Sequence, residues 1–403
     1  MAAVSDRAWH AAIVDLLRRV RLAQPDELAG EINTATRPLA LEVTIYLIDH
    51  EQLRLRAMPE RGKPTPPPLT VHGTLAGRAF TTIRPLAAGD DDGAYRLWIP
   101  MVDGAERLGV AEVIAHEAPA DPARFERHAV DLVGLLGHLI TVKMPYGDGL
   151  QQVRRTQAMS PAGELLLSLL PPLTFSCRRA TVSAILEPCY DVGGDAYDYA
   201  ADGAVIKLAV LDAMGRGLTA GLTCAAALSA IRAARRDGHG LYALARAADA
   251  ALTQQFPDLR FVTGVLAELD MDTGKLRYIN AGHPAPLLLR HGKAVRALAG
   301  GRRMPMGIDD STIEVGEEML EPDDRLLLYT DGVVEAPGAG GDRFGVPRLV
   351  DLAERCAADA LPGPETLRRL ARAAISHQDG PPADDATLLL MDWSGAAAER
   401  TQP

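Results

Sequence analysis

Alternation of apolar and polar residues predicts an α/β domain in the first part of the chain. An amphipathic helix is expected over residues 1–22 and another over 125–142, where apolar residues recur with helical spacing. The Pro- and Gly-containing run 65–82 is predicted to be a loop. These elements together predict one compact domain over residues 1–145. The strand-like runs between them are 41–49, 53–58 and 96–115.

Residues 173–395 show a second, richer pattern of strands and helices. Tight turns such as Met271–Lys275 join the strands, and the helices fall in two blocks. This grouping favours stacked antiparallel sheets flanked by helices over a parallel sheet. The predicted strands are 180–187, 204–213, 261–270, 275–282, 285–291, 324–332 and 385–393. The predicted helices are 218–236, 241–256, 347–360 and 364–377.

Residues 146–172 lie between the two parts and are predicted to be a linker helix. The segment is polar at first and then rich in leucine. Ser160-Pro161 interrupts the pattern, and Pro171-Pro172 ends it. Leucine spacing alone leaves open whether this helix packs only on its own domain.

Length and composition limit the class of protein. A chain of 403 residues with 47% hydrophobic residues is too long for one ordinary domain. The net charge of -11 argues against nucleic acid as a partner. Four cysteines without a CxxC pair predict neither a zinc ribbon nor a disulfide framework, which favours a reducing cytosol. No secretory signal is recognisable and no apolar run reaches ~18 residues, so a cytoplasmic protein without a membrane partner is expected.

Acidic residues recur where predicted strands meet turns. They are Asp195 in GGDAYD, Asp212 in DAMGRG, Asp331 in YTDG, and the pair Asp384-Asp385 in DDAT. One such residue alone is ordinary turn chemistry, because Asp and Gly are common in turns. The joint pattern instead indicates one oxygen-rich metal site, since carboxylates and carbonyls are the ligands that Mg²⁺ and Mn²⁺ prefer.

These motifs, in this order, resemble the SpoIIE-like branch of the PPM metal-dependent serine/threonine protein phosphatases. The resemblance runs from Leu165 to Trp393 and includes SLLPPL from Ser168, YINAGHPAPLLL from Tyr278 and PMG at 305–307. It implies that residues 173–395 form a phosphatase domain with the family's αββα sandwich of stacked antiparallel sheets.

The resemblance also implies a centre with two Mn²⁺ or Mg²⁺ ions, which would lower the pKa of bound water towards ~7 and shield the phosphoryl group. Asp212 would bridge the ions, and the backbone carbonyl of Ala213 would assist. Asp331 would hold one ion and Asp384 the other. Asp195 would complete the second site directly or through water. The four aspartates are therefore the candidate catalytic residues.

Neighbouring residues receive other interpretations. Asp385 is expected to support the site or form a turn, and Asp198 to cap or solvate a turn. Met214 stands where many relatives of the wider superfamily carry His, which leaves the leaving-group acid unidentified. His283 is interpreted as structural, because no GxSxG motif supplies a serine nucleophile. Arg216 would either steer the phosphate or lie solvated in a loop.

The front part, residues 1–145, resembles a GAF domain. The resemblance rests on LAGRAF at 75–80, WIPM at 98–101 and RLGVAEV at 107–113. It allows a small-molecule ligand and a homodimer, and no Cys or His cluster marks a haem, bilin or iron site. In similar phosphatases the linker helix can pair between subunits and couple the sensor to the active site.

The function that these resemblances imply is a protein phosphatase acting on phosphoserine or phosphothreonine and regulated by the front domain. The family suggests a phosphorylated anti-sigma-factor antagonist in a partner-switching pathway as substrate. Two alternatives remain open. One is a non-catalytic dimeric signalling module that retains the fold, against which the four aspartates count. The other is a hydrolase of small phosphate esters.

Overall fold

The chain forms two compact units in the computed structural model. One unit comprises residues 1–156 together with 400–403, and the other comprises residues 157–399. The residues that the structure describes are 5–89, 94–187, 190, 193–311, 314–379, 384–394 and 398–403.

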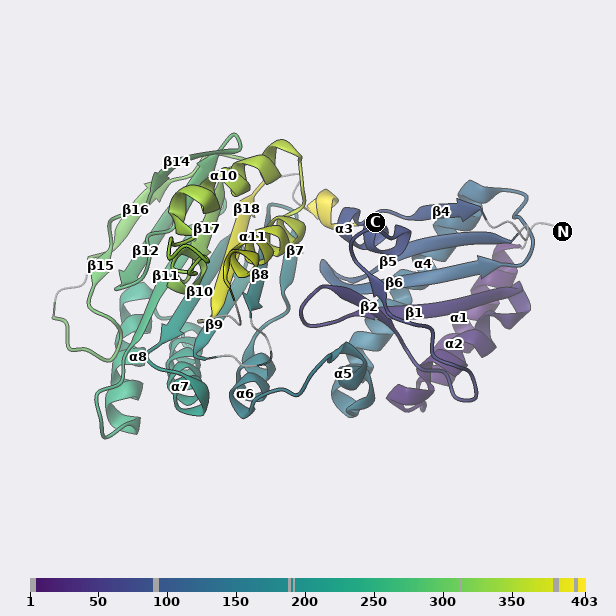
Figure 1. Ribbon diagram of the computed structural model, residues 1–403, viewed down its shortest axis with the longest axis horizontal. Helices are drawn as coiled ribbons and strands as arrows, with labels where there is room; N and C mark the ends of the chain where they lie inside the picture. The colour runs from purple at the N-terminus through teal and green to yellow at the C-terminus, as the bar shows by residue number, and fades with distance from the viewer. Residues whose placement is uncertain are drawn as a thin grey trace. The chain divides into compact units, whose positions relative to one another are not determined.

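The first unit is built on an antiparallel sheet with strand order β3-β2-β1-β6-β5-β4 (Figure 1). Its strands are β1 (Leu41–Ile48), β2 (Arg54–Ala57), β3 (Leu69–Thr70), β4 (Leu86–Gly89), β5 (Tyr95–Asp103) and β6 (Glu106–Ala115). Its helices are α1 (Asp6–Val20), α2 (Leu28–Thr36), α3 (Leu75–Thr82), α4 (Pro122–Lys143) and α5 (Gly149–Arg154). Short 3-10 turns of this unit lie at η1 (Pro25–Glu27), η2 (Arg37–Leu39) and η3 (Met144–Tyr146), and η4 (Ala398–Thr401) includes the boundary between residues 399 and 400.

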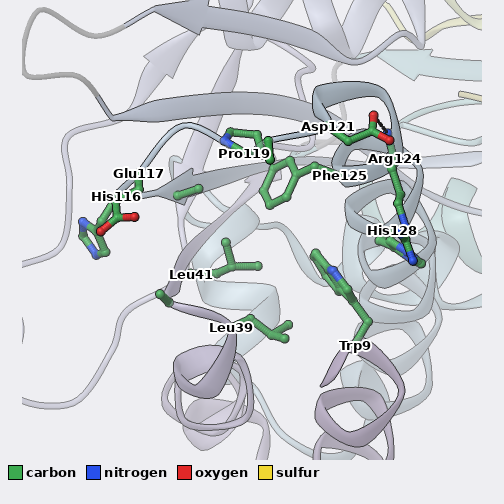
Figure 2. A pocket seen from close by; sticks show the side chains of 13 residues that line it. Trp9, Leu39, Leu41, His116, Glu117, Pro119, Asp121, Arg124, Phe125 and His128 are labelled. Atoms are coloured by element: carbon green, nitrogen blue, oxygen red, sulfur yellow. Dashed lines mark hydrogen bonds between the residues drawn. The ribbon is translucent and has the colours of Figure 1, made fainter. Parts of the chain in front are cut away.

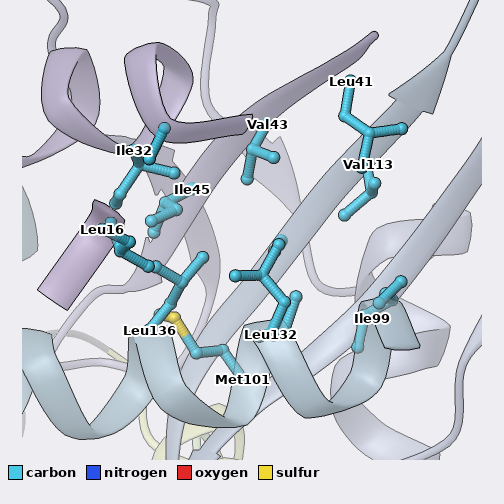
Figure 3. Close-up of a cluster of buried hydrophobic side chains, with 14 of the residues drawn as sticks. Leu16, Ile32, Leu41, Val43, Ile45, Ile99, Met101, Val113, Leu132 and Leu136 are labelled. Carbon is cyan, nitrogen blue, oxygen red and sulfur yellow. The ribbon is translucent and has the colours of Figure 1, made fainter. Parts of the chain in front are cut away.

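Helices cover both faces of this sheet, and side chains that alternate along β1 pack into a separate core on each face. Val43 and Ile45 face the core shared with α1, α2 and α4, which Figure 3 shows around Leu16. Tyr46 and Ile48 face the opposite core, which α3 covers. Side chains one residue apart on a strand point to opposite faces, so a strand buried on both faces reads as a continuous apolar run.

Helix α3 contradicts the loop predicted over residues 65–82. The Thr74 hydroxyl caps this helix by accepting a hydrogen bond from the Gly77 backbone N–H at 3.0 Å. A Cβ on Gly77 would lie 1.9 Å from the Val71 carbonyl oxygen, so glycine allows the helix to approach the preceding strand segment. Glycine at position 77 is thus required for the packing of this helix.

The described residues of the second unit form two sheets. One has strand order β15-β12-β11-β10-β9, with β16 also pairing β12, and the other has strand order β14-β13-β17-β18-β8-β7. The strands of the first are β9 (Asp195–Asp202), β10 (Val205–Ala213), β11 (Val262–Asp270), β12 (Lys275–Ala281), β15 (Arg302–Arg303) and β16 (Gly316–Met319). Those of the second are β7 (Thr174–Cys177), β8 (Ala180–Glu187), β13 (Leu287–Arg290), β14 (Lys293–Ala297), β17 (Arg325–Tyr329) and β18 (Ala386–Trp393). The helices are α6 (Pro161–Leu169), α7 (Gly217–Arg236), α8 (Leu241–Gln255), α9 (Asp331–Val334), α10 (Gly345–Ala358) and α11 (Gly363–His377).

The hydrophobic clusters show that these elements form four layers. On β10, Leu208 and Val210 lie in the core between the two sheets. Ala209 and Leu211 lie in the core against α7 and α8. A third core joins the second sheet to α10 and α11 (Figure 1). The order helix, sheet, sheet, helix confirms the predicted αββα sandwich.

Two sequence predictions in this part of the chain need correction. Strand β9 is absent from the predicted strands, because its sequence DAYDYAAD is rich in Asp and Ala, which are uncommon in strands. It nevertheless pairs along its length with β10. The linker is not one helix, because α5 ends at Arg154 and α6 begins at Pro161 with Ser160 as its N-cap. Leu150 of α5 belongs to the core of the first unit and Leu166 of α6 to a core of the second.

By length and composition, one helix of the described residues, α7, is apolar enough to cross a membrane. Its side chains Ala220, Cys224, Leu228 and Ile231 are buried in the core against the sheet of the second unit. The apolar composition of α7 therefore matches a helix that covers a sheet.

Candidate functional site

Two of the predicted aspartates lie side by side on neighbouring strands. Asp195 begins β9 and is the direct cross-strand partner of Asp212 near the end of β10. Tyr197 and Val210, which share their strand faces, lie in the core between the two sheets. By strand alternation, both carboxylates therefore face this inter-sheet layer, at one end of the sandwich.

The other sheet brings Asp331 and the 384–385 pair to the same end. Tyr329, the last residue of β17, pairs with Leu388 of β18. Asp331 follows two residues later as the first residue of α9, and Asp385 directly precedes β18. A Cβ on Gly332 would lie 1.9 Å from the Asp385 carbonyl oxygen and 3.3 Å from the Asp384 Cβ, so the two segments are in backbone contact.

Asp385 holds the turn that leads into β9. Its Oδ2 atom accepts hydrogen bonds from the backbone N–H groups of Gly193, Gly194 and Asp195, at 2.5, 2.8 and 3.2 Å. The side chain is 5% exposed. A carboxylate committed to three backbone donors acts as a support for the turn, which agrees with the supporting role expected of Asp385.

A threonine hydroxyl contacts each of the paired strand carboxylates. Thr330 Oγ1 donates to Asp195 Oδ2 at 2.8 Å and accepts from the Thr387 backbone N–H at 3.0 Å. Thr263, the cross-strand partner of Asp212 on β11, places Oγ1 3.4 Å from Asp212 Oδ2. Neither threonine is among the residues predicted from the sequence. Thr330 adjoins Asp331 in the YTDG motif, whereas only the strand register reveals Thr263.

The carboxylates raise one another's pKa values. Burial raises the pKa of Asp212 to about 7, and the charges of Asp331, Asp384 and Asp385 add to this shift. Burial and then the charges of Asp212 and Asp385 raise the pKa of Asp195 well above its ordinary value. Partial burial raises the pKa of Asp331, and the negative charges of Asp384 and Glu335 raise it further. The site gathers negative charge without a cationic side chain among the causes of these shifts.

This arrangement fits a hard divalent cation by its chemistry. All the converging donors are oxygen atoms. The negatively charged carboxylates repel one another, and a bound cation would reduce this repulsion. Among the described residues, no group of three or more His, Cys, Asp or Glu side chains has the geometry to hold a metal ion as it stands. The donor set and its charge thus match Mg²⁺ or Mn²⁺, without ready-made coordination geometry.

The metal-free protein is expected to lose stability as pH rises from about 4 to about 7. The pKa of Asp212 in the folded chain is about 7, against an ordinary value of 3.8. In this window the folded state binds more protons than the unfolded state, so the free energy of unfolding falls as pH increases. Thermal unfolding with a chelator at pH 5 to 8 measures this slope. Mn²⁺ should counteract it, and Asp212→Asn should reduce it; a slope identical in wild type and D212N would contradict the assignment.

Three further residues around the site have distinct surroundings. Met214 continues the strand pairing, with its backbone N–H donating to the Phe261 carbonyl at 3.1 Å. Arg216 is exposed at the N-cap of α7, where the described residues show no ion pair to it. Asp198 is not in a turn, contrary to expectation. It is a buried strand residue that forms ion pairs with Arg232 at 2.7 Å and Arg235 at 2.6 Å.

His283 lies close to the acidic cluster. It is 2% exposed, follows β12, and places Nδ1 3.0 Å from Thr263 Oγ1. Burial lowers its pKa to about 4, so the imidazole is neutral at neutral pH. Its buried position at a strand end agrees with the structural role expected of it, while its link to Thr263 was not foreseen.

The first unit contains a small pocket of about 100 Å³. Figure 2 shows the side chains of Trp9, Leu41 and Phe125 turned towards one another around it. At its edge, Asp6 holds Arg124 at 2.6 Å and His128 at 2.9 Å. An apolar space of this size accommodates one small ring or a short apolar group.

Comparison with known proteins finds a family model that matches most of the second unit. Residues 202–394 match the family model of Stage II sporulation protein E (SpoIIE). This range contains Asp212, Asp331 and Asp384, and begins after Asp195.

Two curated proteins and one solved structure illustrate the similarity. Protein IcfG of Synechocystis sp. is 26% identical over 274 residues, which are 60% of this chain and 42% of that protein. Phosphoserine phosphatase RsbU of Bacillus subtilis is 23% identical over 273 residues, 65% of this chain and 80% of that protein. The SiaA-PP2C domain of Pseudomonas aeruginosa has a TM-score of 0.50 at 23% identity, covering 58% of this chain and 94% of the domain, and shares the fold. The chain thus spans less than half the length of IcfG and most of RsbU.

Proposed function

We propose that the second unit of this chain, most of which matches the SpoIIE family model, is a phosphatase domain, and that the protein is a metal-dependent phosphatase acting on phosphoserine or phosphothreonine in another protein. The observation that carries the proposal is the convergence of carboxylates from both sheets at one end of the inter-sheet layer, where they raise one another's pKa values. A catalytic metal centre would explain why the fold retains this unfavourable concentration of charge.

The proposed ligands divide between the two sheets. Asp212 would bridge two Mn²⁺ or Mg²⁺ ions with help from the Ala213 carbonyl, and Asp195 would complete one site. Asp331 and Asp384 would each hold one ion from the opposite sheet. Such ions, when bound, supply an activated water and shield the phosphoryl oxygens. The chain's own contribution is the fixed placement of these oxygens, through Asp385 on the turn at 193–195 and Thr330 on Asp195.

Arg216 is the proposed contact for the substrate phosphate. It follows the Asp212–Ala213 segment by three residues and stands exposed at the start of α7. Its guanidinium group suits phosphate oxygens, and the helix N-terminus adds a favourable dipole. No protein side chain is assigned as the acid for the leaving group, because Met214 occupies the expected position.

The test is phosphate release by the full-length chain from p-nitrophenyl phosphate and from a phosphoserine protein. Activity should require Mn²⁺, stop with a chelator, and fall at least ~100-fold in Asp331→Asn. Asp202→Asn is the matched control, because Asp202 is an exposed residue at the other end of β9. Turnover of the small ester alone would favour the ester hydrolase. Metal binding without any turnover would favour the non-catalytic signalling module.

The proposed substrate class is a phosphorylated anti-sigma-factor antagonist in a partner-switching pathway in the cytoplasm. Support comes from similarity to RsbU, whose name describes it as a phosphoserine phosphatase. Removing a phosphate dianion from such a protein changes its charge by about two units, which is enough to exchange one binding partner for another.

The first unit is proposed to be a GAF-like domain that regulates the phosphatase. Its pocket beside Trp9 supports a small ring-bearing ligand, and each unit has its own hydrophobic cores. Comparing turnover by the full chain with turnover by residues 157–399 tests this regulation. Faster turnover by the shorter chain would reveal inhibition, slower turnover would reveal activation, and equal turnover would argue against a regulatory role.

A further inference from the structure

We propose that Thr263 and His283 form a buried positioning pair that sets the orientation of the Asp212 carboxylate. This inference rests on the proposed function, because it assigns the pair to the carboxylate that would bridge the metal ions. It concerns how the site is held in place, since neither residue is proposed to contact the substrate or a metal ion.

The position of Thr263 follows from strand register. Thr263 and Asp212 are direct partners on β11 and β10, so their side chains stand on the same face of the sheet. Thr263 Oγ1 lies 3.4 Å from Asp212 Oδ2 and 3.0 Å from His283 Nδ1. A threonine side chain is stiff about χ1, so this hydroxyl is held between the two groups.

The positioning role determines where the protons in this chain of contacts must lie. A hydrogen bond from Thr263 to an ionised Asp212, which only accepts, needs the single hydroxyl proton of Thr263. The hydroxyl oxygen must then accept from His283 Nδ1–H. Burial keeps the imidazole neutral by lowering its pKa, which leaves one ring proton for this purpose. The arrangement therefore requires the Nδ1–H tautomer of His283.

The imidazole is held by a network centred on Asn280. Asn280 is fully buried, and its Oδ1 accepts from the His283 backbone N–H at 2.8 Å, while its Nδ2 donates to the Pro284 carbonyl at 3.3 Å. Arg302 Nη1 donates to the His283 carbonyl at 3.1 Å. The turn that carries His283 is thus fixed on both sides of the residue.

The remaining ring nitrogen indicates that His283 is not retained for packing alone. Its Nε2 atom is buried and makes no hydrogen bond of good geometry within the described residues, while a weaker hydrogen bond between His283 and the Tyr329 backbone offsets part of the effect of burial on the pKa. A buried polar atom in this state is unfavourable, and an apolar side chain would avoid it. The contact between His283 Nδ1 and the Thr263 hydroxyl is a reason for the chain to carry histidine here, because an apolar side chain could not make it.

Asp195 shows the same construction on the neighbouring strand. Thr330 Oγ1 donates to Asp195 Oδ2 at 2.8 Å, and the Thr387 backbone N–H fixes that hydroxyl in turn. Each of the paired carboxylates therefore faces a threonine hydroxyl that another group orients. Partners of this kind commonly change metal affinity by about 10–100-fold when they are removed.

The test compares Thr263→Val, which keeps the shape and removes the hydroxyl, with Thr263→Ser, which restores it. Free Mn²⁺ measured by electron paramagnetic resonance gives the affinity of the full-length chain, and kcat and KM for p-nitrophenyl phosphate are measured in parallel. We expect T263V to weaken Mn²⁺ binding about 10–100-fold. T263S should recover most of that affinity, and KM at saturating Mn²⁺ should stay near the wild-type value.

A second pair of variants tests the tautomer. His283→Asn places an N–H donor near the position of Nδ1, and His283→Leu removes the donor at a similar size. H283N should bind Mn²⁺ more tightly than H283L. Thr181→Val is the matched control, because Thr181 is a buried strand threonine whose hydroxyl bonds to Ser176. Thr181 lies six residues from the end of β8 that approaches the site, about 20 Å away along the strand.

Different results overturn different claims. Wild-type Mn²⁺ affinity in T263V, or an equal loss in T263S and T263V, would overturn the positioning role. Equal affinities of H283N and H283L would overturn the part played by the His283 donor. If the wild-type chain binds Mn²⁺ but hydrolyses neither substrate, the proposed function fails, while the order of Mn²⁺ affinities still decides the positioning role.

Discussion

Replacing Asp212 by asparagine is expected to abolish metal-dependent turnover while leaving the protein folded. The charges of Asp331, Asp384 and Asp385 all raise the pKa of Asp212, so Asp212 lies close to the carboxylates of the other sheet. Its replacement removes the carboxylate that is proposed to bridge the two metal ions. Activity should fall by more than the ~100-fold typical of supporting residues, and Mn²⁺ affinity should fall with it. Phosphate release and electron paramagnetic resonance of free Mn²⁺ measure the two effects.

The melting temperature separates this effect from simple unfolding. Asparagine has nearly the same shape as aspartate, and the substitution removes a negative charge from a crowded cluster. The metal-free D212N chain should therefore be as stable as the metal-free wild type or more stable. Asp202→Asn, on the exposed end of β9, should change neither activity nor metal affinity. Full activity in D212N, or a large loss of stability, would refute the assignment.

Replacing Gly332 by alanine is expected to damage both the site and the fold. The new Cβ would lie 1.9 Å from the Asp385 carbonyl oxygen and 2.8 Å from its carbonyl carbon, which is too close for any real contact. The Asp331 and 384–385 segments must separate, with a loss of about 1–3 kcal/mol in stability. A displacement of about 1 Å can cost ~100-fold in rate, so kcat should fall at least that far.

Gly240→Ala is the matched control for this prediction. Gly240 precedes α8 in the same unit and has a negative φ, and a Cβ at this position would meet no neighbouring atom within 4 Å. Alanine there should leave activity unchanged. Chemical denaturation and steady-state kinetics of the two variants give the comparison. If G332A keeps wild-type activity, the close approach of the two segments is not needed for the reaction.

Local signals in the sequence predicted the fold class and most of the candidate ligands. Apolar periodicity identified β10, β11 and β18, because each strand is buried over most of its length. Asp212 lies near the end of β10, Asp331 follows β17 and Asp384 precedes β18, so strand ends and acidic residues were found together. The αββα order followed from the grouping of strands and helices and is confirmed by the three cores of the second unit.

Local signals failed where a residue's environment depends on distant parts of the chain. DAYDYAAD is rich in Asp and Ala, which are uncommon in strands, and it becomes strand β9 through its pairing with β10. Asp198 on that strand is stabilised by Arg232 and Arg235 of α7. The run 65–82 was predicted to be a loop, because the contact of Gly77 with Val71 cannot be read from neighbouring residues. Tertiary contacts outweigh such local preferences.

The sequence by itself determined which residues carry the charge and where the long buried strands β10, β11 and β18 lie, because these depend on side-chain chemistry and on periodicity over a few residues. Only the tertiary structure decided which groups meet. The register of β10 with β11 places Thr263 beside Asp212, and the stacking of two sheets brings the carboxylates of both to one end of the sandwich. Register and stacking arise from contacts between residues far apart in the chain, so no local pattern contains them.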